Sequence, residues 1–301
     1  MARILILGAG VVGEATSEGF ASHGHEVTLV DHDPERVRHL QGRGLHATGE
    51  LDLSGPSTIV FLALPTPAGP SGFDLSALLD GVTALGIALR QATNRHVVAV
   101  RSTVPPFTTN GLVIPRLEEL SRRRAASTFA VAYVPEFLRA ASALEDFLSP
   151  KMTVIACRDD EARAQLEELF GPFGGELRTF GDPTTAEMIK LAQNAFNATK
   201  ISFWNEMWRL CQRVGIDADE VATTVAYAAE GSLNPAYGIR GGYPFAGGCL
   251  PKDVRGLLRV GDEIGVELPL LGAVRQVNET VSRESVQESI TPDGQDAAGP
   301  G

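Results

Sequence analysis

Short runs of apolar residues alternate with helical patterns over the first 180 residues of the chain. The runs predict strands at Arg3–Leu7, Glu26–Asp31, Thr58–Leu64, His96–Arg101, Phe129–Tyr133, Thr153–Cys157 and Glu176–Phe180. Helical segments such as Asp74–Arg90 and Asp159–Phe170 lie between them. Strands that are continuously apolar and alternate with helices are typical of a parallel sheet covered on both faces. We therefore expect an α/β fold with a doubly wound parallel sheet.

The pattern becomes helical after residue 183. The sequence Thr184-Thr185-Ala186-Glu187 predicts a capping box at the start of a helix that runs to Val214 and ends at Gly215. A helix of that length is about 45 Å long and would cross a domain boundary. We expect a dinucleotide-binding domain over 1–183, a helical domain over 184–284 and a disordered tail over 285–301.

Composition and charge exclude several classes of partner. The 301 residues carry a net charge of −11, which gives no general attraction for nucleic acid or anionic lipid. No apolar stretch approaches the roughly 20 residues of a membrane span, and the N-terminus has no cleavage-site pattern. The three cysteines are widely spaced, which favours a reducing compartment. We expect a cytoplasmic protein without nucleic-acid, membrane or metal binding.

A glycine motif follows the first predicted strand. Gly8-Ala9-Gly10-Val11-Val12-Gly13 is a G-x-G-x-x-G sequence between a strand and a helix. Asp31 ends the next strand, 18 residues after Gly13, close to the spacing of a carboxylate that binds ribose hydroxyls. Such a carboxylate repels a 2′-phosphate, so the sequence predicts a Rossmann-like site that prefers NAD to NADP. Arg36 and Arg38, which follow Pro34, are expected on the next helix.

Four further segments carry candidate chemistry. Arg101–Pro106 and Tyr133–Leu138 leave the carboxyl ends of two strands, where ligands of open parallel sheets bind. Lys190 and Asn194 are spaced i, i+4, so they share one face of the long helix. Cys249 lies in a glycine-rich loop before a helix, with Lys252 close by, which favours the reactive thiolate form. Cys157 and Cys211 fit the inert, buried type.

Taken together, these segments resemble the UDP-glucose/GDP-mannose dehydrogenase family of nucleotide-sugar dehydrogenases. The resemblance covers about residues 1–280 and rests on segments in the family's order: Gly8–Gly13, Leu64–Pro67, Ser102–Pro106, Pro135–Leu138, Glu187–Glu206 and Gly247–Asp253. It implies an NAD-dependent, four-electron oxidation of a sugar primary alcohol to a carboxylate. It also implies a small-molecule sugar or nucleotide-sugar substrate.

The resemblance assigns roles to individual residues. Cys249 would hold the substrate as a thiohemiacetal and then a thioester, while Lys190 and Asn194 stabilise oxyanions. Asp253 would orient or deprotonate water, Glu136 is the second candidate base, and Thr103 is a hydroxyl partner. The cofactor-binding set is Gly8, Gly10, Val11, Val12, Gly13, Asp31, Thr66, Pro67, Ser102 and Thr103. The substrate-binding set is Glu136, Phe137, Leu138, Lys190, Asn194, Arg240, Tyr243, Phe245 and Gly247.

The sequence also departs from the family. The resemblance implies a third, Rossmann-like domain that holds much of the nucleotide in family members, and we expect this protein to lack it. Arg139-Ala140-Ala141 stands where the family has Glu and Gly, Arg240 is the nearest substitute for an Arg-Ile-Gly segment, Ala246 replaces a loop glycine, and Phe107 replaces the glycine after Pro105-Pro106. These differences concern the substrate more than the reaction class.

Three hypotheses therefore stay open. The chain is an active four-electron dehydrogenase, a catalytically reduced nucleotide-binding partner protein, or a two-electron 3-hydroxyacid-type dehydrogenase that uses Lys190 and Asn194. These hypotheses differ in the number of NADH molecules formed per substrate consumed. The four-electron dehydrogenase forms two, the partner protein forms none, and the two-electron dehydrogenase forms one. The long helix is apolar on several faces, from Phe196 to Leu210, and the family is dimeric, so we expect a homodimer through this helix.

Overall fold

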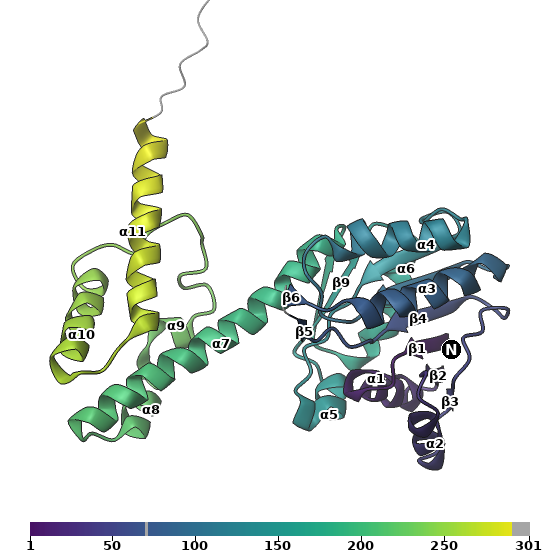
Figure 1. Ribbon diagram of the computed structural model, residues 1–301, viewed down its shortest axis with the longest axis horizontal. Coiled ribbons are helices and arrows are strands. Elements are labelled where there is room, and N and C mark those ends of the chain that lie inside the picture. The colour runs from purple at the N-terminus through teal and green to yellow at the C-terminus, as the bar shows by residue number, and fades with distance from the viewer. Residues whose placement is uncertain (70–71, 291–301) are drawn as a thin grey trace, which may run out of the picture. The chain divides into compact units, whose positions relative to one another are not determined.

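The computed structural model describes residues 1–69 and 72–290, and these form two compact units (Figure 1). Unit 1 spans Met1–Asn194, and unit 2 begins at Ala195. The division falls inside the long helix α7 (Pro183–Val214), later than the expected boundary at 183/184. The first turns of α7 belong to unit 1 because Ala186 and Ile189 pack in its core.

Unit 1 is built on an eight-stranded sheet. Its strand order is β10-β9-β8-β7-β4-β1-β2-β3. The strands are β1 (Arg3–Leu7), β2 (Glu26–Val30), β3 (Ala47–Thr48), β4 (Thr58–Leu62), β7 (His96–Val100), β8 (Phe129–Tyr133), β9 (Met152–Cys157) and β10 (Glu176–Phe180). A short hairpin, β5 (Ala68–Gly69) and β6 (Gly72–Phe73), lies outside it. The expected α/β fold class is confirmed, and each predicted strand is present.

The central strands run parallel, so their carboxyl ends share one edge. Ile6 of β1 pairs with Leu29 on one side and with Phe61 on the other. One detail differs from the expected sheet, because β9 pairs antiparallel with β8. The helix between them, α5 (Ala143–Leu148), has six residues.

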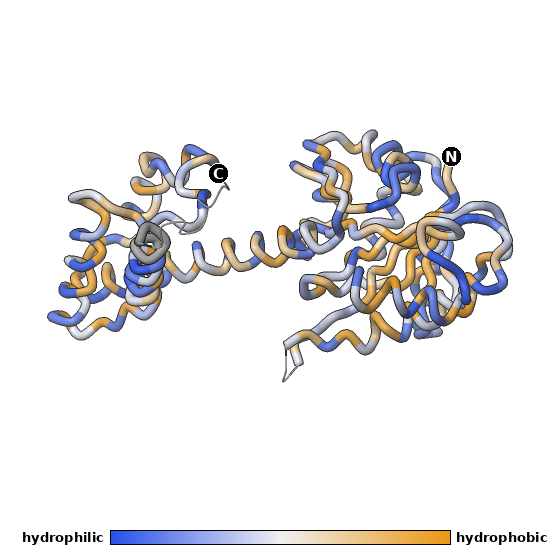
Figure 2. The backbone as a smooth tube through the Cα atoms, turned by 90° about the horizontal axis from the view of Figure 1, so that it is seen from above, coloured by the Kyte–Doolittle hydropathy of each residue, from blue (hydrophilic) through white to orange (hydrophobic). Residues whose placement is uncertain are grey.

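Helices cover both faces of the sheet. One face packs on α1 (Val11–Ser22), α2 (Pro34–Gly42), α5 and α6 (Asp160–Phe170), and the other on α3 (Ser76–Gln91), α4 (Ile114–Ser121) and the start of α7. Three single turns connect these elements: η1 (Thr109–Val113), η2 (Ala140–Ser142) and η3 (Gly171–Phe173). In Figure 2 the strands of unit 1 are mostly orange, as expected for a sheet buried on both faces.

Unit 2 is helical. It contains the second half of α7, then α8 (Ala218–Ala228), α9 (Glu230–Leu233), α10 (Leu250–Ile264) and α11 (Pro269–Ile290). Its core is small and centres on four buried residues: Leu210, Val266, Leu268 and Leu271. Glu206, buried on α7, accepts hydrogen bonds from the N–H groups of Leu270 and Leu271 at the start of α11. This carboxylate therefore fixes α11 to α7.

Two expectations about helix ends need correction. The predicted capping box at Thr184 and Glu187 does not form, because Asp182 accepts the hydrogen bond from the Thr184 N–H and Glu187 bonds to Thr109 instead. The helix α11 continues to Ile290, so the predicted tail cannot begin at 285. The rest of the predicted tail, 291–301, lies outside the described residues. In residues 1–69 and 72–290, no helix combines the length and apolarity that crossing a membrane requires.

Candidate active site

The glycine loop after β1 is shaped by close backbone contacts. Gly8 has φ +96°, and a Cβ there would lie 2.5 Å from the carbonyl oxygen of Ala63. A Cβ on Gly13 would lie 2.0 Å from the carbonyl oxygen of Gly8. A Cβ on Gly10 would meet nothing within 4 Å, so it would project into open space at the start of α1. That open space, at a helix N-terminus without a side-chain cap, suits a pyrophosphate.

Asp31 closes this loop at the carboxyl end of β2. Its Oδ2 accepts a hydrogen bond from the Ala9 N–H at 2.8 Å, and its Oδ1 accepts one from the Asp33 N–H at 3.0 Å. Arg36 lies on α2, as expected, and its Nε donates to the carbonyl oxygen of Ala9 at 2.8 Å. Its guanidinium also pairs with Glu14 on α1. Arg36 thus supports the glycine loop, a contact that the sequence did not reveal.

The loops after β4 and β7 are joined by hydroxyl groups. The Ser102 hydroxyl accepts from the Leu64 N–H at 2.9 Å and donates to the Leu64 carbonyl oxygen at 2.7 Å. The Thr66 hydroxyl donates to the Thr103 carbonyl oxygen at 2.6 Å. Pro67 follows directly, at an exposed position. These predicted cofactor residues therefore come together at the carboxyl edge of the sheet, beside the glycine loop.

Phe107 has an unfavourable backbone conformation in the same region. Its φ is +71°, in the left-handed region that favours glycine, and Phe107 is 70% exposed. A glycine suits the position because it adopts a positive φ without the strain that a Cβ causes. Thr109, two residues later, begins η1, which has π-helical hydrogen bonding. Unusual backbone of both kinds clusters near functional sites.

Lys190 and Glu136 form a buried ion pair. The Lys190 Nζ lies 3.0 Å from the Glu136 Oε1, and the two side chains are 6% and 14% exposed. The other carboxylate oxygen of Glu136 accepts from the Leu138 N–H at 2.7 Å. The Lys190 ammonium also lies 5.3 Å from the ring centre of Phe137. The structure thus brings together four predicted residues from the end of β8 and from α7.

Two buried polar residues near this pair begin the segments Arg101–Pro106 and Tyr133–Leu138, but the sequence assigned neither of them a role. Arg101 directly follows β7, its Nε donates to the Thr16 hydroxyl at 3.1 Å, and its guanidinium lies over the rings of Phe147 and Phe170. Burial lowers the pKa of Arg101 to about 10. Tyr133 at the end of β8 is fully buried, and burial together with the Glu187 carboxylate raises its pKa. An ionisable residue directly at the end of an apolar strand is the signal that would have marked both as individual site residues.

The remaining predicted catalytic residues lie further along the chain. Asn194 is exposed on α7, one turn after Lys190, and ends unit 1. Cys249 is exposed in unit 2 and occupies the N-cap position of α10. Its carbonyl oxygen accepts from the Asp253 N–H at 2.9 Å, one turn into the helix. The Asp253 carboxylate is exposed and pairs with Lys252.

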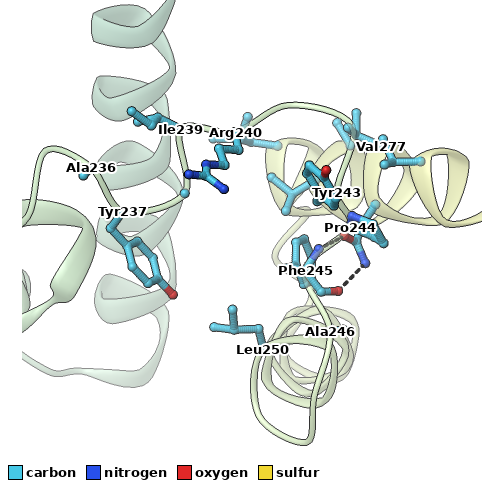
Figure 3. A pocket seen from close by; sticks show the side chains of 16 residues that line it. Ala236, Tyr237, Ile239, Arg240, Tyr243, Pro244, Phe245, Ala246, Leu250 and Val277 are labelled. Atoms are coloured by element: carbon cyan, nitrogen blue, oxygen red, sulfur yellow. Dashed lines mark hydrogen bonds between the residues drawn. The ribbon is translucent and has the colours of Figure 1, made fainter. Parts of the chain in front are cut away.

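A pocket of about 930 Å³ lies in unit 2 (Figure 3). The predicted substrate residues Arg240, Tyr243 and Phe245 line it, together with apolar side chains of α11 such as Val277. The Asn278 side chain holds the backbone of Phe245 with two hydrogen bonds, of 2.7 and 3.0 Å. Gly247, two residues after Phe245, has φ +85° and does not line the pocket. The pocket thus combines aromatic, aliphatic and cationic groups.

Comparison with known proteins decides the family. Residues 2–56 and 42–174 match the NAD binding domain of the UDP-glucose/GDP-mannose dehydrogenase family, and residues 184–280 match its central domain. The chain belongs to the UDP-glucose/GDP-mannose dehydrogenase family. The resemblance inferred from the motifs is confirmed.

The relatives are longer than this dehydrogenase. The chain is 35% identical to the UDP-glucose 6-dehydrogenase AglM of Haloferax volcanii, over 92% of this chain and 69% of the relative. It is 34% identical to the GDP-mannose 6-dehydrogenase of Pseudomonas aeruginosa, over 92% of this chain and 68% of the relative. A crystal structure of a ternary complex of GDP-mannose dehydrogenase from P. aeruginosa superposes with a TM-score of 0.89 at 31% identity, covering 97% of this chain and 71% of that one.

NAD is the cofactor of this dehydrogenase. The matched domain is the NAD binding domain of the family, and the residues present fit the group. The glycine loop leaves open space where a pyrophosphate would lie, and Asp31 directly follows β2 beside it. The N–H groups of Val11 and Val12, in the first turn of α1, would face the phosphates. The chain is accordingly an NAD-dependent oxidoreductase.

Proposed function

We propose that this dehydrogenase oxidises the primary alcohol of a nucleotide-linked sugar to a carboxylate in two successive two-electron steps. The observation that carries the proposal is the buried Lys190–Glu136 pair in the NAD-binding unit, because it holds a cation where charge would develop on a substrate oxygen. The names of the relatives, which are UDP-glucose and GDP-mannose 6-dehydrogenases, support the substrate class. When bound, NAD would accept a hydride in each oxidation step.

Lys190 would stabilise negative charge on the oxygen of the substrate. An ammonium that is desolvated and fixed against a carboxylate needs no reorganisation when an alkoxide develops. Both oxygens of Glu136 already have partners, Lys190 and the Leu138 N–H. We therefore assign Glu136 first to holding Lys190, and its service as a base would require it to exchange one of these contacts. Asn194 would donate a further hydrogen bond to the same substrate oxygen. The Thr103 hydroxyl would hydrogen-bond to the hydroxyl group of the substrate alcohol.

Cys249 would be the nucleophile of the second half-reaction. Its sulfur would form a bond to the aldehyde carbon produced by the first oxidation, giving a thiohemiacetal. The second oxidation removes two more electrons from that carbon and leaves a thioester, which water then cleaves to the carboxylate and the free thiol. Asp253, one helical turn after Cys249, would orient or deprotonate the water.

The pocket in unit 2 suits part of a nucleotide sugar. Its volume of about 930 Å³ is within the range of small-molecule sites. The Arg240 guanidinium has the geometry to bind phosphate oxygens, and the rings of Tyr243 and Phe245 offer faces for a base or a sugar. We propose that these residues contribute to substrate binding, with Glu136, Phe137 and Leu138 in unit 1.

A two-electron dehydrogenase is the second candidate, and one observation favours it. Lys190, Glu136 and Asn194 lie in the same unit as the NAD-binding loop, and they would suffice for a single hydride transfer without Cys249. The two candidates are separated by incubating limiting UDP-glucose or GDP-mannose with excess NAD. We expect two NADH per substrate consumed. One NADH per substrate would favour the alternative, and none with either substrate would favour a nucleotide-binding partner protein.

A homodimer and a cytoplasmic location complete the proposal. On the unit 2 part of α7, Phe196, Ile201 and Trp208 are 66%, 63% and 53% exposed. Apolar side chains on an exposed helix face favour burial against a second copy. Sedimentation of a monomer at micromolar concentration would contradict the dimer.

A further inference from the structure

Glu187 is a fully buried carboxylate near the start of α7. Its Oε1 accepts a hydrogen bond from the Thr109 N–H at 2.7 Å, and Glu187 as a whole is 0% exposed. Its Oε2 is buried and has no hydrogen-bond partner among the described residues. A buried carboxylate with one unpaired oxygen costs free energy. The position therefore carries a charged group that packing alone does not favour.

Glu187 is part of a polar connection between η1 and α7. Beside the Thr109–Glu187 bond, the Asn110 Nδ2 donates to Asp182 Oδ1 at 2.7 Å and to the Thr184 hydroxyl at 3.0 Å. Two consecutive residues of the turn that follows the Ser102–Pro106 loop are thus tied to the beginning of α7. We call these five residues, Thr109, Asn110, Asp182, Thr184 and Glu187, the η1–α7 clamp.

The clamp and the buried ion pair act on the same face of α7. Glu187 and Lys190 are three residues apart, so their side chains leave the helix on one side, about 4.5 Å apart along its axis. Glu187 contacts the loop after β7, while Lys190 contacts Glu136 after β8, and β7 and β8 are paired neighbours. A rotation or shift of the first turns of α7 that breaks one contact would move the other.

We propose that Glu187 is a positioning residue. Its carboxylate fixes the rotation of the first turns of α7 about the helix axis and their position along that axis. It thereby keeps the Lys190 ammonium against Glu136. The consequence for catalysis rests on the function proposed above for Lys190. The placement of Lys190 is a structural claim that can be tested without any turnover.

The lysine content of the chain makes that test selective. The chain has four lysines, and Lys190 is buried whereas Lys151, Lys200 and Lys252 are exposed. The folded protein is treated with an N-hydroxysuccinimide ester of acetate, and acetylation of each lysine is followed by mass spectrometry of its peptides. In Glu187→Ala we expect Lys190 to react at least tenfold faster, with the three exposed lysines unchanged. In Glu187→Gln, whose amide oxygen still accepts from the Thr109 N–H, we expect the Lys190 rate to stay within threefold of the original.

Glu206→Ala is the matched control. Glu206 is also a buried carboxylate of α7 that accepts from backbone N–H groups, but its partners lie at the start of α11. We expect its replacement to leave Lys190 acetylation unchanged. An equal acceleration in Glu206→Ala would show general loosening and overturn the proposal, as would an unchanged Lys190 rate in Glu187→Ala. Where Glu187→Ala does not fold, Asn110→Ala replaces it, and failure to accelerate Lys190 at least threefold overturns the proposal.

Steady-state rates separate this inference from the proposed function. With Lys190 exposed by Glu187→Ala and the oxidation rate unchanged, the positioning role stands and the catalytic role of Lys190 fails. With the rate lowered and the acetylation of Lys190 unchanged, Glu187 acts by another route and the positioning role fails. Under both proposals, Glu187→Ala lowers kcat at least tenfold and Glu187→Gln restores it.

Discussion

The Lys190 ammonium lies 3.0 Å from the Glu136 carboxylate, although the two residues belong to different elements of the fold. Glu136 follows the central strand β8, and Lys190 is on the helix that leaves the sheet after β10. The pair lies at the edge of the sheet where the carboxyl ends of β1, β4, β7 and β8 meet, which is the edge that binds ligands in open α/β folds.

The first prediction concerns Lys190. Lys190→Ala should lower kcat by about 100-fold or more, equivalent to roughly 3 kcal/mol, because the oxyanion loses its countercharge. Both hydride steps should slow, which rapid-mixing measurements of NADH formation would resolve. Lys200→Ala, which removes an exposed lysine from the same helix, is the control and should be unaffected. Equal rates in the two variants would remove Lys190 from the mechanism.

Asp31 should set the cofactor preference. A carboxylate at this position would bind ribose hydroxyls and repel a 2′-phosphate, so we expect kcat/KM at least tenfold higher with NAD than with NADP. Asp31→Ala should narrow that ratio. Asp33→Ala removes a nearby carboxylate that caps α2 and should leave the ratio within threefold. A preference for NADP in the unmodified protein would sink this prediction.

Cys249 should be essential for acid formation but not for cofactor binding. The melting temperature of Cys249→Ser should still rise when NAD is added, because a ligand that binds the native state stabilises it. Net acid formation should stop, since a hydroxyl is a poorer nucleophile than a thiolate and an ester hydrolyses more slowly than a thioester. Cys211→Ala, at a buried cysteine, should retain activity. NADH production by Cys249→Ser within threefold of the original rate would favour the two-electron hypothesis.

Phe107 should cost stability through its backbone. A left-handed conformation costs a non-glycine residue roughly 1–2 kcal/mol, and an exposed ring regains little by packing. Phe107→Gly should therefore stabilise unit 1 by about 0.5–1 kcal/mol, once the greater freedom of glycine in the unfolded chain is subtracted. Phe107→Ala, which keeps a Cβ, is the control and should gain less. Urea unfolding measures both, and a less stable glycine variant would contradict the prediction.

His96 should make the protein sensitive to acid. It is fully buried in β7, and neither ring nitrogen has a hydrogen-bond partner among the described residues. Burial, with Arg3 and Arg123 nearby, lowers the pKa of His96 below its ordinary 6.5. The unfolded chain therefore binds a proton that the folded one does not as pH falls below about 6.5, and stability falls by at most about 1.4 kcal/mol per pH unit.

The matched variants for this prediction are His96→Leu and His32→Gln. His96→Leu should flatten the loss of unfolding free energy between pH 6.5 and pH 5, whereas His32→Gln changes a fully exposed side chain and should leave it unchanged. Urea denaturation at several pH values measures the slope. Equal slopes in the His96→Leu and unmodified proteins would rule out His96 as the source.

The sequence by itself determined the elements whose causes are local. Runs of Val, Ile and Leu placed every long strand of unit 1, and the glycine motif placed the tight turn after β1, because a tight turn and a strand end depend on neighbours in the chain. The family followed from motifs in order, and the matched domains confirm it.

Tertiary structure alone decided the contacts between distant segments. The capping pattern at Glu187 predicted a local hydrogen bond, but the Thr109 N–H, brought close by the sheet, takes that carboxylate instead. Arg101 is buried against Thr16 of α1 and the rings of Phe147 and Phe170, and Tyr133 is buried near Glu187 of α7. Whether Lys190 meets Glu136, and where unit 1 ends on α7, depends on how a helix docks on a sheet. That docking is set by the packing of side chains far apart in sequence, which no local pattern encodes.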